Sequence, residues 1–177
     1  MKIDLESAQP VIQVDTSEPK VGTWSDHFSV PYVRQALPTG DFSLCGCQDL
    51  IVIERKTLDD LIKCLSHDRT RFEDELKRAQ RIPVFHVIVE STYTDLRQGR
   101  YRSKMTPQSA WGSVIALQQS YRIPFFFGES PKVAAKLCEG ILVRWFREHQ
   151  KALTAAMRGA RLAASSEGEQ RMGGNSR

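Results

Sequence analysis

The sequence predicts an α/β domain in which helices cover a mixed β-sheet. Short apolar, β-branched runs of strand length alternate with segments of helical periodicity, which is typical of this fold class. The chain has 177 residues, of which 41% are hydrophobic and 26% are charged, so it can bury a core and has an ordinary globular composition. We find no internal repeat in the sequence; a repeat would have predicted a solenoid instead of this fold.

One strand and a stretch of irregular structure are predicted before residue 40. Val11–Val14 is a short β-branched run, and Pro19 ends it because proline has no N–H to donate to a sheet. Residues 20–39 mix glycine, proline and aromatic residues without a clear period. We therefore expect only a short element there, around Val30–Leu37.

A hairpin is predicted next. Asp41–Cys45 and Leu50–Lys56 are two strand-like runs on either side of residues 46–49. If those four residues form the loop, Asp41 lies directly opposite Glu54, with the two Cβ atoms about 4.5–5.5 Å apart. A two-residue loop would place the two acids diagonally on one face, and a loop of odd length would separate them.

Helices and strands are predicted to alternate from Thr57 onward. Thr57 is suited to cap a helix, and apolar residues recur at i, i+3, i+4 and i+7 from Leu58. The elements expected after it are a helix over 68–81, a strand over 84–89, a polar loop with one helical turn over 92–105, a helix opening at Thr106-Pro107, a strand over 123–127 and a helix from Pro131 to about Lys151.

Three regions are expected: a loose leader over residues 1–9, a folded domain over 10–151 and a flexible low-complexity tail over 152–177, where Ala, Ser, Gly and Arg dominate. Asp4 and Glu6 stand where a secretory signal would need an apolar run. The apolar stretches are strand-sized, so we predict no membrane span and an intracellular protein, in the cytoplasm or at the nucleoid if it is bacterial or phage-like.

Charge and cysteine content say little about function. A net charge of +4 fits nucleic-acid binding and simple solubility equally, and much of the excess lies in the last segment. Cys45 and Cys47 form a C-x-C pair, but no second pair has zinc-ligand spacing. We interpret these two, together with Cys64 and Cys138, as packing residues.

The hairpin is the feature that points to chemistry. Side chains on a strand alternate, so Glu54 and Lys56 share a face while Arg55 points the other way. With Asp41 opposite Glu54, two carboxylates and an ammonium group form one patch. Like charges placed opposite each other are destabilising, unless a cation lies between them. The alternative is that Asp41 only begins a strand and that Glu54 and Lys56 form a solvated pair.

Such a patch suits phosphodiester hydrolysis. Carboxylate oxygens and waters are ligands that Mg²⁺ accepts, and a bound ion polarises the phosphoryl group and lowers the pKa of its water. Lys56 could orient the nucleophile or balance charge on the phosphate. Only a deprotonated Lys56 could act as the base.

These residues carry a resemblance to a known family. Gly40-Asp41, then Glu54-Arg55-Lys56, then Asp60 form the pattern G-D…E-R-K-x-x-x-D, which resembles the signature of the XPF-type structure-selective nuclease domain. That family is related to the restriction-enzyme-like nucleases, and the resemblance covers about residues 10–149. Further similar segments are Thr39–Leu44 (T-G-D-Y-S-L in the family), Val14–Glu18 (V-D-T-R-E), Arg69, Arg71 and Phe72 (R-x-x-F), and Val87–Glu90.

The resemblance implies a restriction-endonuclease-like mixed sheet flanked by helices and a role for each matching residue. Asp41 and Glu54 would bind Mg²⁺ (or Mn²⁺), and the carbonyl of Arg55 would complete the metal shell. Lys56 would be catalytic, and the Arg55 side chain would contact Asp60. Asp15 and Glu18 would be auxiliary acids near the site. Ser17 replaces the family's arginine, which removes a phosphate or salt-bridge contact expected at that position.

The predicted nucleic-acid contacts are Arg69 and Arg71 on a helix and Arg102 and Lys104 in a basic loop. Tyr93 and Tyr101 are interleaved with the basic residues of this part of the chain. The alternative is that the loop is solvated and binds no ligand.

The expected function is that of a metal-dependent endonuclease that acts on DNA at branched or single-strand/double-strand junctions. Family members that recognise branched DNA usually carry a helix-hairpin-helix domain after the nuclease, and the segment after Lys151 is too short and polar for one, so the resemblance alone supports the substrate class. A homodimer or heterodimer through the C-terminal helices is expected, with plain core packing of Ile141, Leu142, Trp145 and Phe146 as the alternative. The rival functions are a non-catalytic DNA-binding scaffold subunit and a protein-interaction module.

Overall fold

The structure is a computed structural model that describes the backbone of residues 8–173 and the side chains of residues 8–157. The chain separates into two units. The main unit is Pro10–Leu142, and it contains every residue of the predicted hairpin. The second unit combines the N-terminal residues up to Gln9 with the chain from Val143 onward.

A six-stranded mixed sheet is the framework of the main unit, with the strand order β2-β1-β3-β4-β5-β6. The β1–β3 and β3–β4 pairs are antiparallel, and the other three pairs are parallel. The predicted fold class, an α/β domain with a mixed sheet flanked by helices, is confirmed. The strands are β1 (Ile12–Val14), β2 (Tyr32–Arg34), β3 (Phe42–Leu44), β4 (Ile51–Thr57), β5 (Val84–Glu90) and β6 (Phe125–Phe127).

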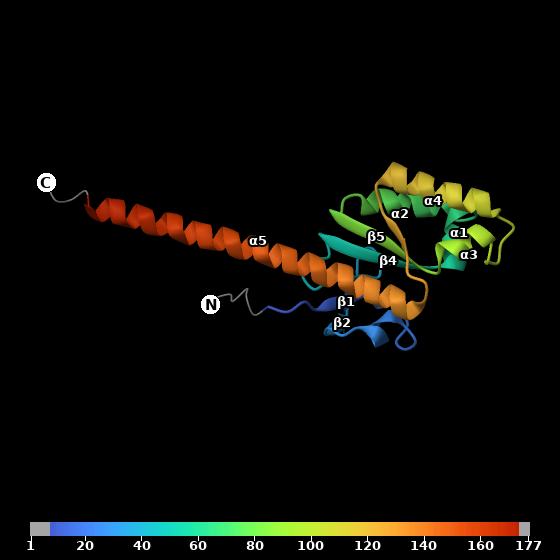
Figure 1. The fold of residues 1–177 in the computed structure, drawn as a ribbon, viewed down its shortest axis with the longest axis horizontal. Helices are drawn as coiled ribbons and strands as arrows, with labels where there is room; N and C mark the ends of the chain where they lie inside the picture. The colour runs from blue at the N-terminus through green and yellow to red at the C-terminus, as the bar shows by residue number, and fades with distance from the viewer. Residues whose placement is uncertain (1–7, 174–177) are drawn as a thin grey trace. The chain divides into compact units, whose positions relative to one another are not determined.

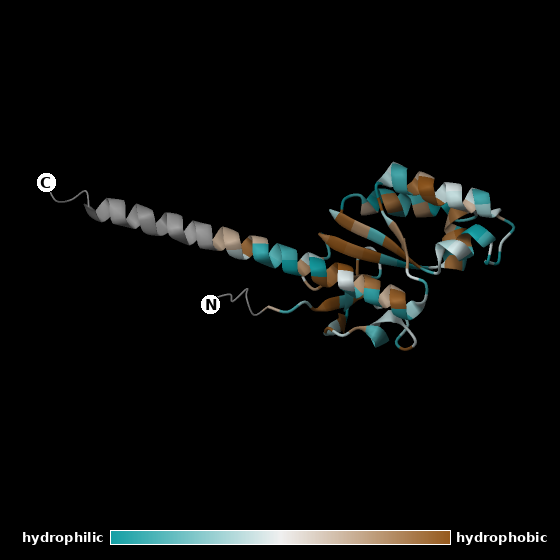
Figure 2. Cartoon of the chain, viewed as in Figure 1, coloured by the Kyte–Doolittle hydropathy of each residue, from teal (hydrophilic) through white to brown (hydrophobic). Residues whose placement is uncertain are grey.

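Helices α1 (Leu58–Leu65), α2 (Arg69–Ala79) and α4 (Pro107–Tyr121) pack together with one face of the central strands, and Figure 1 shows α2 and α4 side by side there. Figure 2 shows that β5 is largely apolar and that β4 is apolar only over its first part, Ile51–Ile53, which is buried. The remaining helical elements are η1 (Trp24–His27), α3 (Tyr93–Gln98) and α5 (Pro131–Gly173). Among the described residues, none of the helices is both long and apolar enough to cross a membrane.

Side-chain alternation along β4 assigns each residue to one of two environments. Val52 belongs to the core beneath α1, α2 and α4, so Glu54 and Lys56 share that face. Ile53 is fully buried but packs on the other face, where Trp24 stacks on Phe42 with 5.1 Å between the ring centroids. Arg55 lies on this second face. Strand β4 therefore holds two charged groups on one face of the sheet and a third on the other.

The predicted hairpin register is confirmed. Phe42 pairs with Ile53 and Ser43 with Val52, which is the register that a four-residue loop would give. The loop itself is longer than predicted, because pairing stops at Leu44 and resumes at Ile51. Asp41 lies just before β3, and its N–H donates to the carbonyl of Ile53 at 2.9 Å.

Gly40 is required by this geometry. Its φ is +72°, and a Cβ atom would lie 2.2 Å from Cγ1 of Val52 and 3.2 Å from the carbonyl oxygen of Ile53. Gly22 has a similar φ of +70°, but a Cβ there would meet nothing within 4 Å. The two positions thus share the backbone cost of a left-handed residue, and only Gly40 adds a clash.

We expect Gly40→Ala to lower the free energy of unfolding by about 2–5 kcal/mol, because the left-handed conformation and the overpacking against β4 both add to the cost. Gly22→Ala should cost about 1–2 kcal/mol, from the backbone alone. Urea denaturation of both variants measures the difference. Equal losses at the two positions would contradict the close approach of Gly40 to β4.

Other elements differ from the sequence expectation. Residues 20–39 hold both η1 and β2 rather than one short element, and the turn expected in 92–105 is helix α3, which Thr92 and Asp95 cap reciprocally. Helix α5 does not end near Lys151 but continues to Gly173, inside the segment predicted as a flexible tail. The division into leader, domain and tail stays a prediction, and most of the leader lies outside the described residues.

Candidate active site

Asp41, Glu54 and Lys56 line one open cavity of about 260 Å³ on the helix-covered face of β4. Glu54 is 5% exposed, and its carboxylate accepts a hydrogen bond from the ammonium group of Lys56. The Lys56 ammonium also lies 5.5 Å from the centre of the Phe72 ring. The other residues that line the cavity are Glu18, Arg55, Thr57, Asp60, Lys63, Cys64, Asp68 and Arg71.

The backbone of β4 fixes the Asp41 side chain. The N–H of Arg55 donates to Oδ2 of Asp41 at 2.7 Å. In a strand the N–H and the C=O of one residue point toward the same neighbour, so the Arg55 carbonyl also faces the side of Asp41. One Asp41 oxygen is thus occupied by the backbone. The predicted grouping of the Asp41 and Glu54 carboxylates with the Arg55 carbonyl is compatible with this arrangement.

Burial and nearby negative charges raise the pKa of both carboxyl groups. Burial, together with the charge of Glu18, raises the pKa of Asp41 to about 6 against the hydrogen bond from Arg55. Burial and the charge of Asp41 raise the pKa of Glu54 to about 8. Burial lowers the pKa of Lys56, but the charges of Glu54 and Glu75 outweigh it and raise that pKa. The ammonium form of Lys56 is therefore favoured in the metal-free protein.

These shifts predict a pH dependence of stability in the metal-free protein. Because the pKa of Asp41 rises from 3.8 to about 6 on folding, the folded state binds more protons than the unfolded state between these values, and stability falls as the pH rises through this window. The expected contribution of Asp41 is roughly 2–3 kcal/mol between pH 4 and pH 7. Asp41→Asn should flatten the decline, which urea denaturation with chelator at several pH values measures. Parallel profiles for the two proteins would contradict the raised pKa.

The donor set suits a hard divalent ion that keeps much of its hydration. Among the described residues, no group of three or more His, Cys, Asp and Glu side chains forms a ready metal cage. Mg²⁺ is usually bound by one or two carboxylates, with waters completing its shell, so two carboxylates and a carbonyl are sufficient. A cation between Asp41 and Glu54 would also offset the charge of Asp41, which helps to raise the pKa of Glu54. The residues present fit Mg²⁺ or Mn²⁺ by this test.

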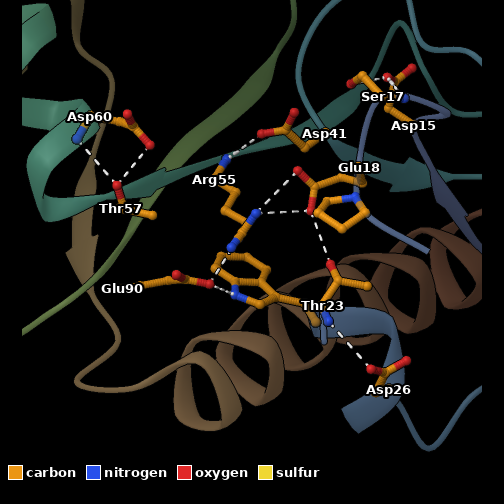
Figure 3. A network of polar contacts seen from close by, with 12 residues as sticks. Asp15, Ser17, Glu18, Thr23, Asp26, Asp41, Arg55, Thr57, Asp60 and Glu90 are labelled. Atoms are coloured by element: carbon orange, nitrogen blue, oxygen red, sulfur yellow. Dashed lines mark hydrogen bonds and ion pairs between the residues drawn. The ribbon is translucent and has the colours of Figure 1, made fainter. Parts of the chain in front are cut away.

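On the opposite face of β4, Arg55 is the centre of a cluster that we call the Arg55 cluster: Glu18, Thr23, Trp24, Arg55 and Glu90 (Figure 3). The guanidinium Nε donates to Glu90 at 2.8 Å, and Nη1 donates to Glu18 at 3.2 Å. The indole N–H of Trp24 donates to the same Glu90 oxygen, and the Thr23 hydroxyl donates to Glu18 at 3.1 Å. The cluster ties the β1–β2 connection to the strand that carries Glu54 and Lys56.

The predicted contact between Arg55 and Asp60 is wrong. Glu18 and Glu90 take the guanidinium group, while Asp60 accepts a 2.7 Å hydrogen bond from the Thr57 hydroxyl and a 3.2 Å bond returns from the Asp60 N–H to Thr57 (Figure 3). Asp60 lies in the first turn of α1, and its side chain contacts the N-cap Thr57 rather than the far side of β4. It still lines the cavity.

The two auxiliary acids differ in position. Glu18 lines the cavity, and its charge raises the pKa of Asp41. Asp15 is not among the residues that line the cavity; its carboxylate accepts from the N–H groups of Ser17 at 2.8 Å and Leu37 at 2.6 Å. Burial would raise the pKa of Asp15, but these bonds and the Ser17 hydroxyl lower it. Asp15 therefore holds a turn.

Of the four predicted nucleic-acid contacts, Arg71 alone lines the cavity, with its side chain 80% exposed. Arg69 is paired with Glu73 at 2.8 Å and also donates to Ser113. Arg102 and Lys104 are exposed in the loop between α3 and α4. The four residues thus fall in two places.

Sequence reasoning did not identify Glu90 or Trp24 as part of the site. Trp24 is fully buried, and its N–H also completes the Arg55 cluster. Glu90 pairs with Arg55 only because β5 runs parallel to β4 and places Glu90 next to Thr57 in register. The signal that could have identified Glu90 was an acid at the end of an apolar strand that lies beside the E-R-K strand.

This fold, with two acids and a lysine at one cavity beside a mixed sheet, defines a nuclease-type domain. A family model of the ERCC4 domain matches residues 14–141, well over half of the chain, so the chain belongs to the ERCC4 domain family. No curated protein matches the sequence significantly. The predicted resemblance to the XPF-type nuclease domain is confirmed.

The solved structures that are similar to this chain include two of XPF from Aeropyrum pernix. XPF from Aeropyrum pernix, in complex with DNA, is 28% identical with a TM-score of 0.63 over 79% of this chain and 66% of that chain. XPF from Aeropyrum pernix in a second structure is 29% identical with a TM-score of 0.62 over 77% of this chain and 61% of that one. This chain thus spans somewhat less than two thirds of the relatives that it matches.

Proposed function

We propose that this domain is a divalent-metal-dependent endonuclease that hydrolyses phosphodiester bonds in DNA. The observation that carries the proposal is the convergence of Asp41, Glu54 and Lys56 on one cavity, with both acids buried enough to raise their pKa values. Buried acids held this close destabilise a metal-free protein, which favours a functional role over a structural one.

The residues divide the chemistry among them. The carboxylates of Asp41 and Glu54 and the carbonyl of Arg55 would hold Mg²⁺ or Mn²⁺, which supplies Lewis acidity and an acidified water when bound. Lys56 is cationic and next to Glu54, so its ammonium group is suited to donate to a phosphoryl oxygen and to stabilise negative charge there. Arg71, exposed at the cavity, is suited to orient a phosphate, and Asp60 fixes the start of α1 beside it.

We further propose DNA as the polymer and a junction between single and double strands as its form. One similar structure is that of XPF in complex with DNA, and basic side chains stand both at the cavity and in the α3–α4 loop. Arg69 and Arg71 would contact phosphates near the scissile bond, and Arg102 and Lys104 would contact them farther away. A dimer through the C-terminal helices stays a prediction; Leu142, one of its proposed contacts, is fully buried within the main unit.

Cleavage of end-labelled forked, flapped and linear DNA, with Mg²⁺, Mn²⁺ or chelator, tests the proposal. We expect metal-dependent products from the forked and flapped substrates, at least about tenfold faster than from linear duplex, since the exposed single strand is reached without unpairing. Products that persist in chelator would contradict the metal-dependent mechanism. If the protein binds these substrates but cleaves none with any metal, it is a scaffold subunit and the proposal is wrong.

A further inference from the structure

Cationic side chains gather where α3 leads into α4. Between Tyr93 and Trp111 the sequence has four cationic side chains and a single carboxylate, that of Asp95. Asp95 is already paired with Arg100 at 2.9 Å. Within the part of the chain whose side chains are described, the other three cations of this segment, Arg97, Arg102 and Lys104, form no ion pair. The segment therefore offers uncompensated positive charge to a polyanion.

Beside these cations lies an open cavity of about 740 Å³, which we call the α4 groove: Arg97, Thr106, Pro107, Gln108 and Trp111. The Trp111 ring meets Tyr93 edge-on, with 5.1 Å between centroids, and Tyr93 lies 4.0 Å from the Phe127 ring. The half-buried indole is thus held by its neighbours at the edge of the groove. A fixed aromatic ring next to a guanidinium group is the combination that binds an unpaired base and its phosphate.

The loop that joins α3 to α4 also contacts helix α1, which borders the catalytic cavity, the one lined by Asp41, Glu54 and Lys56. The N–H of Arg102 donates to the carboxylate of Asp59 at 2.9 Å. Asp59 is in the first turn of α1, next to Asp60, which lines the catalytic cavity. Loop 99–106 therefore contacts the helix that contributes Asp60 to the catalytic cavity, and its Thr106 lines the α4 groove. Arg102 and Lys104 are exposed on this loop.

We propose that the α4 groove binds the single-stranded flank of the nucleic acid whose phosphodiester is cut at Asp41 and Glu54. An unpaired base would stack against Trp111, Arg97 would contact its phosphate, and Arg102 and Lys104 would contact the phosphates that lead to the catalytic cavity. The occupant is a single strand because a base in a duplex has no free face to offer the indole. That the bound strand leads to Asp41 and Glu54 rests on the proposed function. Binding of a single strand in the α4 groove requires no cleavage.

Fluorescence anisotropy of a labelled oligothymidylate, in chelator, tests the role of Arg97. We expect Arg97→Glu to weaken binding about tenfold and to reduce the salt dependence of the affinity by about 0.7 in the log–log slope, the loss of one single-strand phosphate contact. Arg81→Glu is the matched control, because Arg81 is exposed, forms no ion pair among the described side chains and lies after α2, away from loop 99–106. It should change the affinity by less than about twofold. Equal weakening in the two variants would overturn the proposal.

Tryptophan fluorescence tests the stacking directly. In a Trp145→Phe background the emission comes from Trp111 and the fully buried Trp24. Oligothymidylate and oligouridylate should both quench it, a blunt duplex should not, and Trp111→Phe, a variant that retains a ring, should remove the quenching while a thermal melt shows that it folds. Quenching that persists in Trp111→Phe, or that the duplex produces equally, would overturn the groove.

The outcome can be separated from that of the proposed function. Asp49→Asn should bind oligothymidylate as tightly as the unmodified protein, because Asp49 is exposed in the hairpin loop and lines neither the groove nor the catalytic cavity. If no metal supports cleavage but Arg97→Glu selectively loses the single strand, the nuclease proposal fails and the groove stands. If cleavage is normal and the two arginine variants bind alike, the groove fails and the nuclease stands.

Discussion

Asp41→Asn and Glu54→Gln are each expected to reduce Mg²⁺-dependent cleavage by at least about 10³-fold, because each removes a carboxylate from a site that has only two. Lys56→Met should reduce the rate by about 10²–10³-fold without weakening metal binding, since it removes a donor to the phosphate rather than a ligand. Single-turnover cleavage of forked DNA measures all three. Asp49→Asn, in the exposed loop of the same hairpin, is the matched control and should be unchanged.

The same substitutions should separate activity from stability. Asp41 is a partly buried acid whose ionisation is opposed by desolvation and by the charge of Glu18, so Asp41→Asn should leave the metal-free protein at least as stable at pH 7 as the unmodified one. Glu54→Gln differs, because it deprives the half-buried Lys56 of its partner and should cost stability. A large loss of stability in Asp41→Asn would show that Asp41 is a structural residue and would undermine its assignment as a ligand.

The second large effect is expected at Glu90. Its side chain is 8% exposed and accepts from both Arg55 and Trp24, so Glu90→Ala should lower the free energy of unfolding by about 3–5 kcal/mol. The cost arises because the Arg55 guanidinium is left with Glu18 as its one carboxylate partner, and because the buried indole N–H of Trp24 loses its acceptor. Chemical denaturation measures it, and Glu90→Gln, which keeps an acceptor, should recover part of the loss.

Asp74 provides the comparison for an ion pair at the surface. It pairs with Lys77 at 2.7 Å, but the two side chains are 51% and 57% exposed. Asp74→Ala should therefore cost at most about 1 kcal/mol. If Glu90→Ala lowered the free energy of unfolding as little as Asp74→Ala does, the Arg55 cluster would not stabilise β4, which would contradict this account.

The hairpin could be predicted in detail because local rules and function coincide there. Two apolar runs around a short polar loop set the register, Gly40 permits the close approach, and strand alternation then assigns Glu54 and Lys56 to one face. The cap at Thr57 followed from the same reasoning. Each of these features depends on residues that are neighbours in sequence or across one hairpin.

The Arg55 cluster could not be predicted in that way. Its members come from the β1–β2 connection, β4 and the end of β5, up to 66 residues apart in the Trp24–Glu90 hydrogen bond. Parallel pairing of β4 with β5 brings them together, and no local pattern specifies which strands will be neighbours. For the same reason Asp60 was assigned to Arg55 although the cap of α1 holds it beside Thr57.

Mn²⁺ binding, counted by the loss of the free-ion signal in electron paramagnetic resonance, tests most directly whether Asp41 and Glu54 jointly hold one divalent ion. The account predicts one ion for each unmodified domain, displaced by Mg²⁺, with binding lost in both Asp41→Asn and Glu54→Gln and retained in Lys56→Met. Undiminished binding of Mn²⁺ in either carboxylate variant would contradict a shared site.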